Sequence, residues 1–139
     1  MRISIELEEN CEPEQISPLA LAYIGDAVLE LYVRTFLVNQ GSFKVNALHK
    51  KAVKFVNAVT QASLLRKIEE SLTMEELAIA KRGRNAKSGH VPKNAEVIDY
   101  RYSTGLETLI GFLFLKGRTD RIAEIFLVLR QIVEAIEIY

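Results

Sequence analysis

The sequence predicts a single all-helical domain, and three observations lead to this prediction. The chain has 139 residues, of which 49% are hydrophobic, enough for one sizeable core. Apolar residues recur at three- and four-residue steps along most of the chain, which is the period of an amphipathic helix. After the first few residues there is no sustained alternation, hairpin signal, internal repeat or low-complexity linker.

Local start and stop signals place the helices along the chain. Pro18 suits the first turn of a helix over 19–37, and Gly41 is of the kind that closes helices. Thr73 followed by Glu76 has the spacing of a capping box, which predicts the start of a helix that continues to about residue 81. The other expected elements are helices at about 44–55, 57–71, 103–116 and 120–138, and a loop at 83–92.

The first part of the chain is acidic. Residues 1–15 contain several glutamates and one basic residue, Arg2. We predict that this segment lies outside the domain, which then covers residues 16–139.

A secretion signal has basic residues followed by an apolar stretch, and the first 15 residues do not have this order. The longest apolar run, "LIGFLFL", is far shorter than the ~20 residues of a membrane span. The sequence therefore predicts a cytoplasmic protein with no membrane partner.

Basic residues gather in two places, although 18 basic and 18 acidic residues give a formal net charge of +0. The stretches "KVNALHKKAVKF" and "KRGRNAKSGHVPKN" contain no acidic residue. A ligand experiences the local field, because salt screens charges beyond ~10 Å. Both stretches predict faces that bind a polyanion. For the first, a solvated surface stays an open alternative; the second is a loop rich in Gly and Asn, which has no structural need for so many cations.

Two acidic residues stand inside apolar helices beside glycines. Asp26 follows Gly25 in "YIGDAVLELYV", and Glu107 lies between Gly105 and Gly111 in "STGLETLIGFLFLKG". Glycine costs about 1 kcal/mol relative to alanine inside a helix, but it lets a neighbouring backbone approach closely. The two helices are therefore expected to cross and bring the acids together. Two close carboxylates repel each other unless a cation intervenes, and Mg²⁺ prefers oxygen ligands. The alternative is that each acid faces solvent at a helix edge.

Other ionisable residues give weaker signals. Glu30, one turn beyond Asp26, could extend the acidic face, but it is interpreted as a solvated helix residue or a partner for Arg34 at i+4. Cys11 is the only cysteine, and His49 and His90 have no ligand-like spacing to it or to each other, so a zinc site is not expected. No nucleophile elbow and no phosphate-binding glycine loop occurs.

These motifs resemble a known family. "YIGDAVLEL" resembles the signature of the ribonuclease III endonuclease domain, and "LETLIGFLFLKG" resembles the second conserved helix of that family. The order, separation and helical setting of the motifs agree over about residues 16–138. The loop "KRGRNAKSGHVPKN" is similar to that of the Mini-ribonuclease III branch. We also expect no appended double-stranded-RNA-binding domain, as in that branch.

The resemblance implies an activity and two site residues. Asp26 matches the catalytic aspartate of the family and Glu107 its metal-binding glutamate, so both are expected to bind Mg²⁺. Members of the family are homodimers that use Mg²⁺ and cut double-stranded RNA, and the Mini branch matures a large-subunit (23S) ribosomal RNA precursor in bacterial cytoplasm. We therefore expect a Mg²⁺-dependent endoribonuclease in which an activated water attacks the phosphodiester in line.

The sequence departs from the full ribonuclease III pattern at three positions. That pattern has acids four and seven residues before the aspartate, where this chain has Ala22 and Leu19. It also has an acid three residues before the glutamate, where this chain has Thr104. With two carboxylates, water and RNA phosphate oxygens must complete the coordination of the metal, which Mg²⁺ accepts.

RNA contacts are expected to be made with phosphates and 2′-hydroxyls, because the deep, narrow groove of an RNA duplex hides its base edges. A two-fold dimer would supply one site for each strand, with its interface along 19–37 and near Phe112 and Phe114. RNA shape, or a ribosomal protein that shapes the RNA, is expected to select the cleavage site. The predicted RNA-binding residues are Lys50, Lys51, Lys81, Arg82, Arg84, Asn85, Lys87, Lys93 and Arg101.

Other functions stay open at this point. A catalytically silent RNA-binding protein on the same fold would not need Asp26 and Glu107; the missing acids favour it, and the two acids in awkward helix positions argue against it. If the protein were a helical protein–protein adaptor with no nucleic acid partner, neutralising the basic residues from Lys81 to Lys93 would change only its solubility. A metal-dependent nucleotide hydrolase would need histidine ligands that the chain does not offer.

Overall fold

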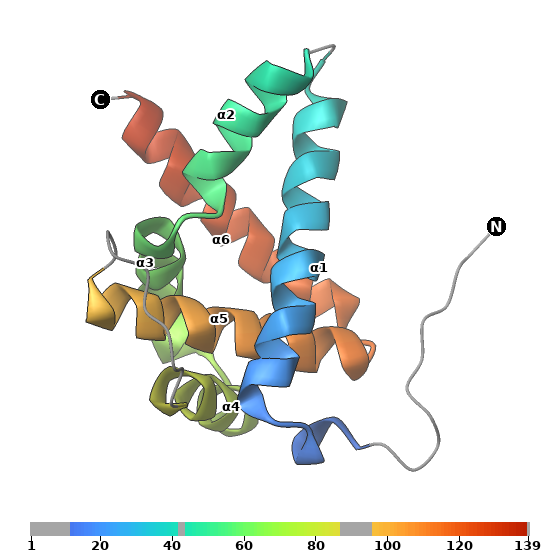
Figure 1. Ribbon diagram of the computed structural model, residues 1–139, viewed down its shortest axis with the longest axis vertical. Coiled ribbons are helices and arrows are strands. Elements are labelled where there is room, and N and C mark those ends of the chain that lie inside the picture. The colour runs from blue at the N-terminus through green and yellow to red at the C-terminus, as the bar shows by residue number, and fades with distance from the viewer. Residues whose placement is uncertain (1–11, 42–43, 87–95, 139) are drawn as a thin grey trace, which may run out of the picture.

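A computed structural model describes residues 12–41, 44–86 and 96–138, and these residues form helices and short connections without a strand (Figure 1). The prediction of an all-helical domain is confirmed. The elements are the 3₁₀ turns η1 (Pro13–Gln15) and η2 (Glu69–Ser71) and the helices α1 (Pro18–Asn39), α2 (Val45–Phe55), α3 (Ala58–Ile68), α4 (Met74–Asn85), α5 (Val97–Leu115) and α6 (Thr119–Ile138).

Helix α5 is the centre of the fold. It packs against α1, α3 and α4, and Figure 1 shows α1 crossing it while α4 runs beneath it. Its middle is inaccessible to solvent, and Leu106, Leu109 and Phe112 are fully buried, whereas Val97 and Ile98 in its first turn are exposed. A helix segment that is apolar nearly all round, as α5 is from residue 106 to 113 apart from Glu107 and Thr108, belongs inside a protein, because it has no face for water. The prediction that Phe112 contributes to a dimer interface is therefore wrong, since its ring already fills the core.

Helix α1 carries apolar residues on two faces. Its buried face includes Leu21, Val28, Leu29 and Val33. The apolar series that runs through Leu19 and Tyr23 is instead exposed, so that the two faces together give the dense apolar pattern of the sequence. Because the chain itself leaves this second face open, it is available for contact with another molecule.

Side-chain caps begin three of the helices. The hydroxyl of Ser17 accepts from the backbone N–H of Ala20, and the side chain of Asn57 accepts from that of Thr60. The capping box of Thr73 and Glu76 is present as predicted, with both reciprocal hydrogen bonds formed. Each cap satisfies backbone donors that a helix start leaves without a partner.

Two helix boundaries differ from the prediction. Helix α4 continues through Gly83, which was expected in a loop, because the missing side chain lets this helix press against α5. Helix α5 begins at Val97, ahead of the expected residue 103, and an ion pair between Arg66 and Asp99 ties its first turns to α3. Both differences arise from contacts between helices, which a local pattern does not contain.

The residues before α1 pack against the helices. Pro13 is buried, the carboxylate of Glu14 pairs with Lys116, and Arg82 donates to the carbonyl oxygens of Glu14 and Ile16. The domain boundary between residues 15 and 16 remains a prediction. None of the described helices combines the length and the apolar character needed to cross a membrane.

Candidate active site

A contact between two glycines positions the helices that carry the two acids. Gly25 of α1 and Gly111 of α5 face each other where the helices cross. A Cβ added to Gly25 would stand 1.8 Å from the carbonyl oxygen of Glu107, and one added to Gly111 would stand 2.0 Å from that of Leu21. Since real side chains do not tolerate such distances, only glycine permits the two backbones to lie this close. The predicted close crossing is therefore present.

The crossing brings Asp26 and Glu107 together. Asp26 is exposed and Glu107 is half-buried, and their carboxyl groups are close enough to share a hydrogen bond. Burial, the negative charge of Asp26 and a hydrogen bond to Asp26 together raise the pKa of Glu107 to about 8, and burial is the largest of these causes. A carboxyl pair of this kind holds a proton or a cation between its oxygens. The alternative that each acid faces solvent separately does not describe this geometry.

Gly105 was expected to allow the close approach of the helix that carries Asp26, but it allows the approach of a different helix. A Cβ at this position would stand 2.8 Å from the carbonyl oxygen of Ala80, so Gly105 serves the approach of α4 rather than that of α1. Gly83 of α4 faces the same contact, where a Cβ would stand 2.2 Å from the hydroxyl oxygen of Thr108. Helix α5 thus has a close crossing with α1, which includes the backbone of Glu107, and a second close crossing with α4.

Within the part of the chain that the structure describes, the pair has no third acid beside it. Among the residues that the structure describes, no group of three or more His, Cys, Asp or Glu side chains could hold a metal ion. Ala22 and Thr104 are buried, and the hydroxyl of Thr104 donates to the carbonyl oxygen of Tyr100. Glu30 forms an ion pair with Arg34 at 3.2 Å, which confirms its interpretation as a surface helix pair. The site therefore offers two carboxylates.

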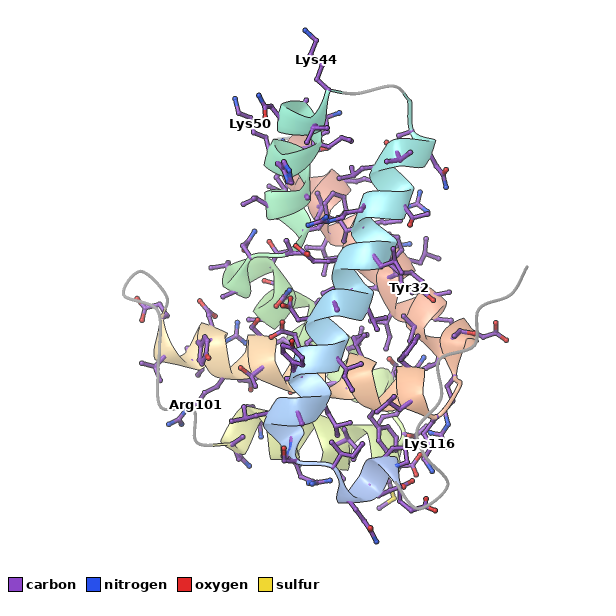
Figure 2. The ribbon with its side chains drawn as sticks, turned by 45° about the vertical axis from the view of Figure 1, so that its right-hand side comes forward. Tyr32, Lys44, Lys50, Arg101 and Lys116 are labelled. Atoms are coloured by element: carbon purple, nitrogen blue, oxygen red, sulfur yellow. The ribbon has the colours of Figure 1, made fainter. Side chains whose placement is uncertain are left out.

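Six of the predicted RNA-binding residues are exposed: Lys50, Lys51, Lys81, Arg82, Asn85 and Arg101. Lys50 of α2 and Arg101 of α5 both extend from the left-hand side of the molecule in Figure 2. Lys87 and Lys93 lie outside the described residues.

Arg82 and Arg84 are engaged within the chain. The guanidinium group of Arg82 donates to two backbone carbonyls before α1. That of Arg84 donates to the hydroxyl of Tyr102 and lies 3.5 Å from Glu69. A guanidinium group has five N–H donors, so each residue retains donors for another ligand. Their predicted contact with RNA remains a prediction.

Sequence reasoning missed the stack formed by Arg66, Tyr102 and Arg84. The guanidinium groups of the two arginines lie 4.5 and 5.1 Å from the centre of the Tyr102 ring. This stack joins α3 and α4 to the first turns of α5. The spacing of arginine and tyrosine along the sequence carries no signal for it, because the three residues come from three helices.

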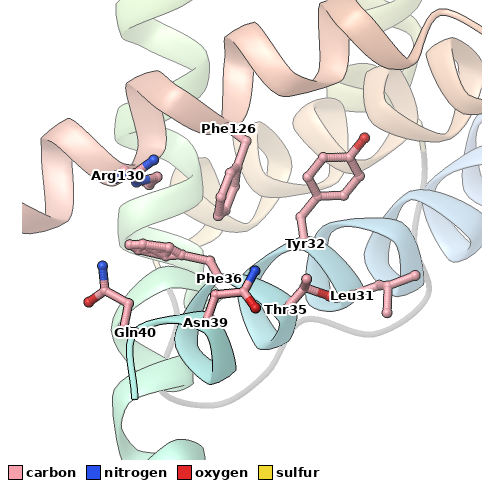
Figure 3. A pocket seen from close by; sticks show the side chains of 8 residues that line it. All are labelled: Leu31, Tyr32, Thr35, Phe36, Asn39, Gln40, Phe126 and Arg130. Atoms are coloured by element: carbon pink, nitrogen blue, oxygen red, sulfur yellow. The ribbon is translucent and has the colours of Figure 1, made fainter.

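A hollow lies apart from the acid pair, between α1 and α6 (Figure 3). It has a volume of about 550 Å³, with Tyr32 and Phe36 on one side and Phe126 and Arg130 on the other. Leu31, an exposed residue of α1, lies at its edge. The hollow therefore adjoins the exposed apolar face of α1, and neither Asp26 nor Glu107 lines it.

The comparisons with known proteins identify the family. The sequence-family model described as the ribonuclease III domain matches residues 19–118, which include Asp26 and Glu107 and the two glycines at the α1–α5 crossing. The chain belongs to the ribonuclease III family. It is an endoribonuclease of the ribonuclease III type.

Relatives and a solved structure agree with this membership. The Mini-ribonuclease 3 of Desulfitobacterium hafniense is 52% identical over 108 residues, which cover 78% of this chain and 68% of that protein. The Mini-ribonuclease 3 of Brevibacillus brevis is 49% identical over 114 residues, covering 82% and 85%. The crystal structure of protein FN1578 from Fusobacterium nucleatum has a TM-score of 0.80 at 30% identity, covering 87% of this chain and 98% of that one. The ribonuclease III fold is thus present.

Proposed function

We propose that this ribonuclease III domain is a Mg²⁺-dependent enzyme that cleaves double-stranded RNA, and that its substrate is a precursor of large-subunit (23S) ribosomal RNA. The observation that carries the chemistry is the pairing of Asp26 and Glu107 at the glycine crossing. The names of the Mini-ribonuclease 3 relatives support the substrate class, and the precursor follows from the resemblance to that branch.

The two carboxyl groups suit a hard divalent cation. Glu107 is held in a half-buried place beside a second acid, where its charge is costly without a positive partner. Mg²⁺ commonly takes one or two carboxylates and completes its octahedron with water and phosphate oxygens. We therefore assign Asp26 and Glu107 as its protein ligands. When bound, the ion polarises the scissile phosphate and lowers the pKa of a bound water.

The side chains of the pair have unequal surroundings and we assign them unequal roles. Glu107 is set into the crossing, so its carboxylate is a fixed anchor for the cation. Asp26 is exposed, and its outer oxygen can accept a hydrogen bond from the attacking water and orient it toward the phosphorus. Asp26 is therefore the residue that faces the substrate.

RNA is bound by cationic and amide side chains on α2, α4 and α5. Lys50, Lys81 and Arg101 are exposed and project from three separate helices, which suits contacts spread along a phosphate backbone. Asn85 adds a neutral donor. Arg82 and Arg84 contribute the N–H donors that their partners in the chain leave over. Affinity is expected to be modest and to fall steeply with salt, since phosphate contacts release counterions.

The active form is a two-fold homodimer. The exposed face of α1 supplies the apolar surface for it, with Tyr23 84% and Leu31 65% exposed. The adjoining hollow can receive side chains of a second copy. Two sites related by the two-fold axis would cut the two strands of a duplex. Selection of the natural site by a ribosomal protein remains a prediction.

The experiment that tests the function is incubation of a long RNA duplex with the purified protein, with and without Mg²⁺, followed by gel analysis. Discrete cleavage that needs Mg²⁺ is expected. A duplex that is retarded on a native gel but never cut would identify the silent RNA-binding protein. If neither cleavage nor retardation occurs, the proposed function is wrong.

A further inference from the structure

Thr108 lies at a junction of three helices. It follows Glu107 in α5 and is fully buried. Its hydroxyl oxygen stands 2.7 Å from the carbonyl oxygen of Thr104 in its own helix and 3.1 Å from that of Pro18, the first residue of α1. Because a hydroxyl has one proton to donate, the carbonyl oxygens of α5 and α1 compete for it.

The third helix at this junction is α4. A Cβ added to Gly83 would stand 2.2 Å from the hydroxyl oxygen and 2.6 Å from the Cβ of Thr108. The backbone of α4 therefore closes over the side chain and leaves it no room to take another rotamer without a shift of a helix. The hydroxyl itself lies against the backbone of Gly83, and this packing holds its oxygen near the carbonyl oxygen of Pro18.

The glycine crossing alone does not determine how α1 is oriented on α5. Gly25 and Gly111 bring two backbones together through van der Waals contact, which has no directional preference. The apolar side chains packed around the crossing limit how far the two helices can rotate or slide, and a directional bond narrows this range further. The bond from Thr108 to Pro18 is directional, and it lies about one turn from Gly111 along α5 and about two turns from Gly25 along α1.

We propose that Thr108 is a positioning residue for the carboxyl pair: its hydroxyl sets the register of α1 on α5 and thereby the separation of Asp26 and Glu107. Where it concerns the metal, the inference rests on the proposed function. A site that has two carboxylates among the described residues offers no third acid that could compensate for a misplaced one. Functional groups must be held within about 0.5 Å of their productive places. Thr108 touches neither carboxyl group, and it acts through the helix that carries Asp26.

The first test compares Thr108→Val with Thr108→Ser. Valine has the shape of threonine and cannot donate, whereas serine keeps the donor. Mn²⁺ binding to the intact protein without RNA is measured by calorimetry, and the Mg²⁺ concentration for half-maximal cleavage is measured on a duplex. Thr108→Val is expected to weaken Mn²⁺ binding and raise the Mg²⁺ requirement by about tenfold, while Thr108→Ser stays within about twofold of the parent.

Ser103→Ala is the matched control. Ser103 is another buried hydroxyl of α5, and it donates to Gln61 of α3, a helix that carries neither acid of the pair. This variant is expected to lower the melting temperature and leave Mn²⁺ affinity unchanged. If Thr108→Val does the same, losing melting temperature but not metal affinity, Thr108 is merely structural and the proposal is overturned.

A second measurement needs no metal. In metal-free protein, Asp26→Asn replaces one of two acids that lie close together without a cation between them, and is expected to raise the melting temperature. The rise is expected to be smaller in the Thr108→Val background, because the carboxyl groups are then further apart. An equal rise in both backgrounds contradicts the proposal. A parent protein that neither binds Mn²⁺ nor cleaves RNA would instead overturn the proposed function, and this measurement would still decide the role of Thr108.

Discussion

Gly25 of α1 lies against Glu107 of α5 so closely that a Cβ on the glycine would stand 1.8 Å from the glutamate carbonyl oxygen. The acid neighbour of Gly25 thereby comes within reach of the side chain of Glu107. Glycine thus costs helix stability at this position but allows two helices to share one carboxyl pair.

Gly25→Ala is expected to separate α1 from α5. The new methyl group has no space, so the free energy of unfolding falls by about 3 kcal/mol and cleavage is lost even where the protein stays folded. Thermal melting and duplex cleavage are the measurements. Gly117→Ala is the control: at φ 73 it is strained, but nothing lies within 4 Å of its added Cβ, so melting temperature falls slightly and cleavage persists. Equal losses in both variants would contradict the crossing.

Stability is expected to decrease as pH rises from 4.5 to about 8 in metal-free protein. In this window folded Glu107 keeps a proton that the unfolded chain has lost, because its pKa is raised from 4.5 to about 8 by burial and by Asp26. The folded state therefore binds more protons, and the free energy of unfolding falls with pH, by an amount on the order of a few kcal/mol.

Denaturant titrations at a series of pH values measure this slope. Glu107→Gln is expected to remove the contribution of this residue, and Mg²⁺ is expected to reduce it by stabilising the charged pair. Asp26→Asn should reduce it only in part, since burial is the larger cause of the raised pKa. An unchanged slope in Glu107→Gln would show that another group is responsible.

Asp26→Asn is expected to keep the fold and to abolish cleavage. The amide has nearly the shape of the carboxylate, and Asp26 is exposed, so packing is not disturbed. It offers no negative charge to the cation, so activity falls by at least about a thousandfold. Glu30→Gln, one turn further along α1 in a surface pair with Arg34, is the control that retains activity. Mg²⁺-dependent cleavage that survives in Asp26→Asn removes the mechanism.

The salt dependence of RNA binding, measured together with the melting temperature, distinguishes basic residues that contact only RNA from basic residues that also form hydrogen bonds within the chain. Lys81→Gln is expected to weaken duplex binding and to reduce the slope of log affinity against log salt by about one, with an unchanged melting temperature. Arg82→Gln is expected to lower the melting temperature as well, because Arg82 also donates to the carbonyls before α1. Binding measured in the Asp26→Asn background avoids cleavage of the probe. A slope that neither substitution changes would place the RNA elsewhere.

Leu31→Lys is expected to produce a monomer. This side chain is 65% exposed on the apolar face of α1 and lies at the edge of the hollow, so a charge there would be buried in the proposed interface. Val59→Lys on α3, at a position 61% exposed, is the control that stays dimeric. Sedimentation velocity measures both. A parent chain that is already monomeric at working concentrations contradicts the dimer itself.

Local signals predicted most of the fold. The cap at Thr73 and the all-helical class depend on residues close in sequence, and both are confirmed. The boundaries at Gly83 and Val97 were missed because contacts with α5 and α3 determine them. The close crossing beside Asp26 was predicted from glycines in two separate motifs, and the same argument misplaced Gly105, whose neighbour is α4.

The sequence by itself determined that two acids sit in apolar helices with glycines at their sides, since residue type and helical period are properties of the chain alone. Only the tertiary structure decided which glycine meets which helix, which of the two apolar faces of α1 is buried, and that Thr108 reaches Pro18. The physical reason is that these outcomes depend on how helices distant in sequence fit together, and close packing accepts one such fit among many with the same pattern.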